Sequence, residues 1–155
     1  MEIWALILTG LGLGMMVGLS GVGSAIGTVI GGQAVIGSMK KKPENFGLYL
    51  VLSALPATQG LYGFVGFFIY SGVVAAAGGA SMPLFKAAIL FGAGFALGIA
   101  NLISAIKQGQ VCASGISAIG SGHNVFGNTL ILAAFPEFYA ILSLVASILM
   151  TNLIK

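Results

Sequence analysis

The sequence contains no arginine and no aspartate, and charged residues of any kind make up only 6% of its 155 positions. Its acidic residues are all glutamates, and its basic residues are lysines apart from one histidine. Soluble domains carry about 25% charged residues, so the composition excludes an ordinary soluble fold. With 58% hydrophobic residues and a mean hydropathy of +1.09, the chain is predicted to be an integral membrane protein.

Cysteine and histidine are also scarce. One cysteine, Cys112, excludes an internal disulfide bond, and we expect it to fill space within a helix. The one histidine, His123, is expected to be a solvated loop residue, and without a His or Cys pair at ligand spacing a transition-metal site is not predicted. Gly21-Val-Gly23 lacks the strand and helix of a dinucleotide fingerprint. We therefore expect no organic cofactor.

The hydrophobic residues fall into four stretches that are each long enough to cross a bilayer core of about 30 Å. They cover residues 3–36, 46–70, 84–119 and 125–153, joined by loops 37–45, 71–83 and 120–124. The first residues lack the positive region of a cleavable signal, so 3–36 is expected to be a retained transmembrane helix. The predicted fold is an all-α membrane protein.

The lysines predict how the chain is oriented in the cell membrane. Lys40, Lys41 and Lys42 form one cluster in the first loop, and the positive-inside rule assigns such a loop to the cytoplasm. With four crossings, loops 37–45 and 120–124 are cytoplasmic and both termini lie outside. Because half of the lysines form this short cluster, the net charge of +3 does not indicate nucleic-acid binding.

A shift of eighty residues aligns the two halves of the chain without a gap. It pairs Pro56 with Pro136, and it pairs Phe46-Gly47 with Phe126-Gly127 and Ser24-Ala25-Ile26 with Ser104-Ala105-Ile106. We interpret the chain as one membrane domain, 1–155, made of two tandem helical hairpins, 1–78 and 79–155. The shift places Ala57 opposite Glu137, so only the second hairpin carries a carboxylate.

Glu137 is the one acidic residue deep inside a hydrophobic stretch, residues 129–149. A carboxylate at the bilayer centre costs about 2.5–3.5 kcal/mol on insertion scales, so it usually serves an ion or proton path or a partner. Three other polar side chains share its depth: Thr58, Gln59 and Gln108 each lie about 13 residues from a cytoplasmic loop, as Glu137 does. At 1.5 Å per residue, all four are about 20 Å from the same membrane face.

Together these side chains offer four oxygen donors and one negative charge, which suits a hard monovalent cation. Pro56 and Pro136 each remove a helical hydrogen bond, so a freed backbone carbonyl could complete the ligand shell. A proton site needs only the carboxyl group and a few hydrogen-bond partners, so the additional oxygens favour Na⁺. A purely structural network of amides between helices remains an alternative at this point.

Glycines recur at every fourth position in the first stretch, and small residues follow the same spacing in the third. Such spacing produces a flat stripe on which another helix can approach closely. The glycines are Gly10, Gly14 and Gly18, then Gly23, Gly27 and Gly31, and in the third stretch Gly94 and Gly98. We expect these two helices to form a crowded layer.

Three segments resemble a known family. Leu55-Pro-Ala-Thr-Gln-Gly-Leu-Tyr-Gly63, Lys107-Gln-Gly109 and Pro136-Glu-Phe-Tyr-Ala-Ile-Leu142 are similar to the rotor-ring proteolipid of V-type ATPases. More narrowly, they resemble the duplicated K subunit of bacterial Na⁺-transporting V-type ATPases. The resemblance implies a homo-oligomeric ring that moves ions while other subunits hydrolyse ATP, so the chain is not expected to be an enzyme by itself.

The resemblance also implies roles for single residues. Glu137 would be the ion-carrying carboxylate, and Tyr62 would hold that carboxylate locked. The remaining Na⁺ ligands would be the side-chain oxygens of Thr58, Gln59 and Gln108 and the backbone carbonyl of Leu55. The first and third stretches would form the inner wall of the ring. The second and fourth would face lipid and the stator.

The implied partners are copies of the same chain, a stator membrane protein with a basic residue, central-stalk proteins on the cytoplasmic side, and lipid.

Two positions depart from the family. Ala57 stands where a glycine is familiar, and loop 120–124 lacks the charges expected for contact with the stalk. Lys107 points to another helix face than Gln108 and is not assigned to the ion path. Lys40–Lys42 could contact the stalk or serve only as a topology signal.

Three alternatives stay open on the sequence. The same ring could carry H⁺, because a bare Glu137 can bind a proton when Na⁺ is scarce. A small membrane antiporter could use Glu137, in which case an aromatic-lined pocket is expected beside it. A membrane scaffold held together by its glycine stripes would give no reason for a carboxylate at the depth of Thr58 and Gln108.

Overall fold

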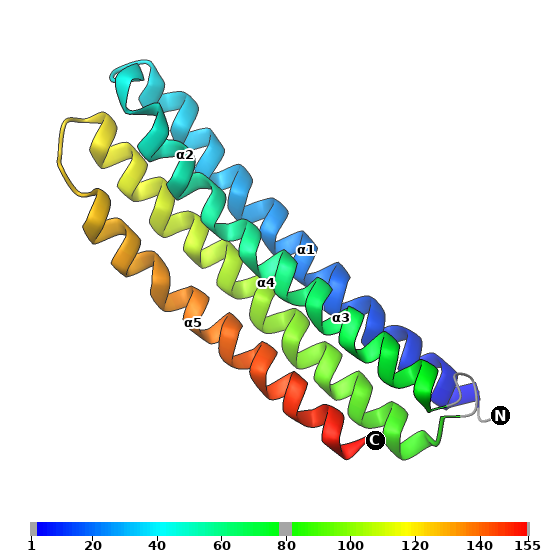
Figure 1. Ribbon diagram of the computed structural model, residues 1–155. Coiled ribbons are helices and arrows are strands. Elements are labelled where there is room, and N and C mark those ends of the chain that lie inside the picture. The colour runs from blue at the N-terminus through cyan, green and yellow to red at the C-terminus, as the bar shows by residue number, and fades with distance from the viewer. Residues whose placement is uncertain (1–2, 78–81, 155) are drawn as a thin grey trace.

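The computed structural model describes residues 3–77 and 82–154 as long, nearly parallel helical rods (Figure 1). The first rod is α1 (Ile3–Met39) and the third is α4 (Leu84–Gly120). The second consists of η1 (Pro43–Asn45), α2 (Phe46–Ala54), η2 (Leu55–Ala57) and α3 (Thr58–Ala76), and the fourth of α5 (Phe126–Met150) and η4 (Thr151–Leu153). The all-helical fold with two hairpins is as predicted.

Within the described residues, four helical rods are long and apolar enough to cross a membrane: Ile3–Met39, Pro43–Ala76, Leu84–Gly120 and Phe126–Leu153. Each contains most of one predicted stretch, and the second extends six residues beyond the predicted end at position 70. The predicted boundary between the hairpins, at 78/79, lies outside the described residues. The chain is therefore a multi-pass membrane protein.

The two prolines at equivalent positions of the repeat have different effects on the backbone. Pro56 lies in the 3₁₀ turn η2, which separates α2 from α3, because proline supplies no N–H for the helical ladder. Pro136 lies inside α5, which continues past it as one helix. Neither proline can donate a helical hydrogen bond, but only Pro56 lies at a break between two helices.

The loops and termini occupy opposite ends of the bundle. In Figure 1 the N- and C-terminal ends lie together at one end, and the turns after α1 and after α4 lie together at the other. This arrangement agrees with the prediction that loops 37–45 and 120–124 share one side of the membrane. Which side is cytoplasmic remains a prediction.

Close contact between α1 and α4 depends on glycine. A Cβ atom added to Gly23 would lie 2.5 Å from Cα of Leu102, and one added to Gly109 would meet the backbone of Gly27. Gly94 likewise packs on the backbone of Gly12. The predicted crowded layer therefore exists within a single chain. The predicted stripe Gly10, Gly14 and Gly18 does not take part, because added Cβ atoms there would meet nothing within 4 Å.

The buried residues of the described ranges include two apolar clusters with polar side chains between them. One cluster, toward the termini, includes Met16, Tyr70 and Leu97, and the other, toward the loops, includes Tyr49, Cys112 and Ile116. Between them lie six buried polar residues, which we call the polar layer: Ser20, Ser24, Gln59, Asn101, Ser104 and Gln108. Cys112 is a buried residue of the apolar core, as predicted.

Candidate functional site

The turn at Pro56 positions the first three site residues. Thr58 follows η2 directly, and its hydroxyl donates to the carbonyl oxygen of Leu55 at 3.0 Å and to Oε1 of Gln59 at 3.3 Å. Tyr62 stands one turn later on the same helix, since positions four apart share a helix face. The structure thus gathers the oxygens of Leu55, Thr58 and Gln59 into one group.

Gln59 connects α3 to α4 through its side-chain amide. The side chain is fully buried, and its Nε2 donates to Oε1 of Gln108 at 2.8 Å and to Oγ of Ser104 at 3.2 Å. These bonds join residues that are 49 and 45 positions apart in the chain. The two hairpins therefore meet at this amide.

Gln108 continues the connection from α4 to α5. Its Nε2 donates to Oε2 of Glu137 and to the carbonyl oxygen of Ala133, both at 3.0 Å. Gln108 is fully buried. The depth argument from the sequence placed Gln59, Gln108 and Glu137 at one level, and these hydrogen bonds bring the three residues together.

Glu137 receives a second hydrogen bond from the opposite side. The hydroxyl of Tyr62 donates to Oε1 of Glu137 at 2.8 Å, while Gln108 occupies Oε2. The carboxylate is only partly buried, and its neighbours Phe135, Phe138 and Tyr139 are 60%, 56% and 67% exposed on the outside of the bundle. Glu137 therefore lies at the border between the polar layer and an exposed aromatic surface.

The hydrogen-bond donors of the network all point in one direction. The hydroxyl of Thr58 donates to Gln59, the amide of Gln59 donates to Gln108, and the amide of Gln108 donates to Glu137. The sequence predicted that Gln108 would present its oxygen to an ion. In the structure its nitrogen faces the carboxylate, because Oε1 already accepts from Gln59.

Ser104 belongs to the site but was not predicted as a site residue. It is buried, accepts from Gln59, and donates to the carbonyl oxygen of Pro136 at 2.7 Å, one residue before Glu137. The repeat held a signal for it, since the eighty-residue shift pairs Ser104 with Ser24. In the first hairpin Ser24 is also used between helices, where its Oγ accepts from the backbone N–H of Gly60 at 2.6 Å.

Lys107 and His123 lie apart from this network. Lys107 is exposed on α4 while the next residue, Gln108, is buried, and its Nζ donates to Gln110 at 3.4 Å. His123 is exposed in the turn after α4, beside Gly122, whose φ of +97° favours glycine. The carboxylate of Glu137 is bonded to Tyr62 and Gln108 and not to Lys107 or His123. This agrees with the sequence analysis, which did not assign Lys107 or His123 to the ion site.

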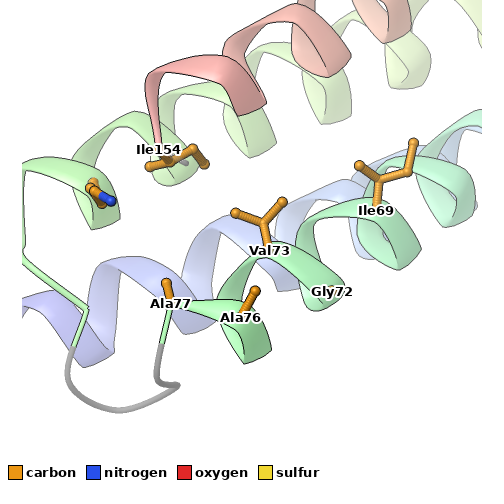
Figure 2. A pocket seen from close by; sticks show the side chains of 7 residues that line it. Ile69, Gly72, Val73, Ala76, Ala77 and Ile154 are labelled. Atoms are coloured by element: carbon orange, nitrogen blue, oxygen red, sulfur yellow. The ribbon is translucent and has the colours of Figure 1, made fainter.

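Two cavities of the bundle are lined by residues other than Glu137. Figure 2 shows one of about 530 Å³ at the terminal end, lined by Ile69, Val73 and Ile154 among others. Another, of about 540 Å³, lies between α4 and α5 and is lined by Phe135, Pro136 and Tyr139, with Ser104 and Lys107 on its α4 side. An antiporter was expected to have an aromatic-lined pocket at Glu137, and Glu137 does not line this one.

Comparison with known protein families gives two matches within the chain. Residues 11–70 and residues 91–150 each match the family described as the C subunit of ATP synthase. The chain belongs to this family. Both ends of the second match are shifted by eighty residues from the first, which is the repeat predicted from Pro56 and Pro136. The chain is a duplicated proteolipid of the rotary ATPases.

Individual relatives agree with this assignment. The K subunit of the A-type ATP synthase of Methanocaldococcus jannaschii is 37% identical over 94% of this chain, which spans 62% of that relative's length. The K subunit of the V-type sodium ATPase of Enterococcus hirae is 38% identical over 84% of this chain and 81% of its own length. The c″ subunit of the V-type proton ATPase of Saccharomyces cerevisiae is 28% identical over 92% of this chain and 68% of its own length.

The family assignment confirms the predicted class of protein. A member of this family is part of a rotary ATPase and is not itself catalytic, as the sequence predicted. The names of the relatives include both a sodium ATPase and a proton ATPase. The relatives therefore do not decide which ion this chain transports, and its own residues must be considered.

Proposed function

We propose that this chain is the ion-translocating rotor subunit of a V/A-type ATPase and that it carries Na⁺ on Glu137. The observation that carries the proposal is the position of Glu137, a carboxylate within an apolar span whose two oxygens accept from Tyr62 and Gln108. A carboxylate at this depth is costly unless it serves an ion or proton path. Membership of the rotary ATPase proteolipid family supports such a path.

The grouping of oxygens beside this carboxylate supports Na⁺ as the ion. Oγ1 of Thr58 lies 3.0 Å from the carbonyl oxygen of Leu55 and 3.3 Å from Oε1 of Gln59. Gln108 joins this group to Glu137 through two hydrogen bonds. Hard cations take carbonyl, hydroxyl and carboxylate oxygens as ligands, and these residues supply all three kinds.

Binding of a cation requires the amide of Gln108 to turn. An N–H group that donates to Glu137 repels a cation at the same place, whereas Oε1 would attract it. If the Gln108 amide rotates by half a turn, its Oε1 faces the cation and no longer accepts from Gln59. Oε1 of Gln59 then stays beside Thr58 as a ligand, and Nε2 of Gln59 keeps its hydrogen bond to Ser104.

Proton transport is the second candidate, and the observation that favours it is that Gln108 presents its N–H group, not its oxygen, to Glu137. A proton needs no oxygen ligand from Gln108, so it could neutralise Glu137 without any rotation of this amide. In either case, neutralising Glu137 removes the bare charge that would otherwise face lipid through the surface of Phe135, Phe138 and Tyr139.

The chain acts within a larger complex in this proposal. Copies of the chain form a ring, with α1 and α4 on the inner wall and α3 and α5 facing lipid and a stator protein whose basic residue displaces the ion. The turns after α1 and α4 face the cytoplasm and contact the central stalk, and both termini face outward. The open stripe of Gly10, Gly14 and Gly18 offers a close approach to a neighbouring copy.

Equilibrium binding of radioactive Na⁺ to the purified intact complex tests the proposal. We expect one Na⁺ per chain, displaced by unlabelled Na⁺ but not by K⁺, and no bound Na⁺ in a complex carrying Glu137→Gln. Gln at this position keeps the size of the side chain but removes the charge. Transport activity without any Na⁺ binding would instead establish the proton-carrying form.

A further inference from the structure

Asn101 lies in the polar layer at the place where three helices meet. It is fully buried on α4, and its Nδ2 donates to Oγ of Ser20 on α1 at 3.0 Å. Gly63 on α3 also packs against Ser20, since a Cβ atom there would meet Ser20 and the carbonyl oxygen of Met16. The Asn101 amide is therefore bonded to a residue of α1 that α3 also contacts.

The other atom of this amide has no hydrogen-bond partner. Among the described residues, Oδ1 of Asn101 is the one buried side-chain nitrogen or oxygen for which no partner is found. More than nine-tenths of buried polar groups in proteins have a partner, either a protein group or an ordered water, because an unpaired buried carbonyl loses its hydration without replacement. A donor is thus required at Oδ1.

Turning the amide around does not remove this requirement. If Oδ1 and Nδ2 exchanged places, Oδ1 would accept from the hydroxyl of Ser20, and Nδ2 would face the same place without an acceptor. The assignment of the two atoms is therefore immaterial to the argument. A group that can both donate and accept satisfies either orientation, and water is the small molecule with that property.

The neighbouring polar groups have partners already. One turn toward the loops, Ser104 is bonded to Gln59 and Pro136, and Ser24 accepts from Gly60. On the terminal side, the next buried side chains are those of the apolar cluster that includes Met16 and Leu97. Ser20 accepts from Asn101 and keeps its own hydroxyl hydrogen, so a molecule at Oδ1 could be held by both residues.

We propose that Asn101 and Ser20 bind one internal water molecule, which completes the polar layer between the two apolar clusters. The water is a fixed part of each chain and is not a ligand of the ion carried at Glu137, because Asn101 and Ser20 bond to each other while Glu137 is held by Tyr62 and Gln108. The proposal holds whichever ion the protein transports.

A structure of the intact complex, at a resolution that shows ordered waters, tests this directly. We expect one density peak per chain within hydrogen-bond distance of both the outer amide atom of Asn101 and Oγ of Ser20. Apolar atoms alone around that amide atom would overturn the proposal, as would a protein group, such as a rotated Ser104 hydroxyl, that donates to it.

The variant Asn101→Leu, of similar size, provides a second test. We expect the peak to be lost in this variant and kept in the matched control Asn128→Leu, which changes an exposed asparagine of α5. Reaction of Glu137 with a carbodiimide should be unchanged in both. A peak that persists without Asn101 would show that other groups hold the water. If Asn101→Leu does not fold, the density in the unmodified complex decides.

Discussion

The hydroxyl of Tyr62 donates a 2.8 Å hydrogen bond to Oε1 of Glu137, across 75 positions of the chain and from one hairpin to the other. Gln108 donates to the other carboxylate oxygen at 3.0 Å. The carboxylate is thus held by one side chain from α3 and one from α4. An ion carrier needs such a closed arrangement in the membrane and must be able to open it where ions exchange.

Tyr62→Phe removes one of these two bonds and leaves the aromatic ring in place. Since a hydrogen bond to a charged group contributes about 1.5–3 kcal/mol, and about 1.4 kcal/mol is a factor of ten, we expect Na⁺ affinity to fall roughly tenfold or more. Sodium titration of the purified complex measures the effect. The control is Tyr139→Phe, which changes an exposed tyrosine two residues after the carboxylate. Equal effects of the two variants would contradict a locking role for Tyr62.

Gln108→Leu should have a larger effect, because three hydrogen bonds depend on this side chain. The variant removes one of the two acceptors of the buried Gln59 amide, leaving it bonded to Ser104 alone, and it removes an oxygen that a cation needs. We expect Na⁺ affinity to fall roughly a hundredfold, which corresponds to about 2.7 kcal/mol. Gln110→Leu is the matched control on the exposed face of the same helix. Wild-type affinity in Gln108→Leu would show that the amide is structural only.

Ser104→Ala tests a residue that supports the site through hydrogen bonds without being a proposed ion ligand. The serine accepts from Gln59 and donates to the carbonyl of Pro136, so its loss should loosen both without removing an ion ligand. We expect Na⁺ affinity to fall only a few-fold, since a neutral hydrogen bond contributes about 0.5–1.5 kcal/mol. The control Ser114→Ala changes an exposed serine that bonds to its own helix. A loss as large as that of Gln108→Leu would make Ser104 a direct participant.

Much of this arrangement could be predicted because the depth of a residue in the membrane follows from the number of residues between it and the nearest loop. Residues at equal distance from a loop lie at equal depth when each span is a straight helix, so Gln59, Gln108 and Glu137 were expected to share a level. The contact between Tyr62 and Glu137 was expected only from the family resemblance. Depth alone does not show which face of a helix a residue occupies.

Other features depend on packing and could not be read from the sequence. The role of Ser104 was missed because a serine hydroxyl can equally bond to its own helix, as Ser114 does. Pro56 and Pro136 occupy equivalent positions, yet only Pro56 interrupts its helix. Similarly, the stripes at Gly10–Gly18 and Gly23–Gly31 have the same spacing, yet only the second packs against other helices of the chain.

The two glycine stripes give a prediction that separates folding from assembly. Gly94→Ala places a Cβ atom against the backbone of Gly12, so we expect the chain to lose about 1–3 kcal/mol of stability through overpacking. Gly14→Ala meets nothing within 4 Å of its own chain, so the chain should fold, while the ring of copies becomes less stable to detergent. Thermal unfolding and native mass spectrometry measure the two effects. An intact, equally stable ring in Gly14→Ala would contradict the placement of this stripe between copies.

The most direct measurement for the central claim is the rate at which a hydrophobic carbodiimide labels Glu137, across pH, with and without Na⁺. Such reagents react with a protonated carboxyl group in an apolar site, so Na⁺ and H⁺ should compete for this residue. The account predicts that Na⁺ slows labelling most at high pH, that K⁺ does not, and that Glu137→Gln is not labelled. Labelling that follows pH but is the same with and without Na⁺ would contradict Na⁺ binding at Glu137.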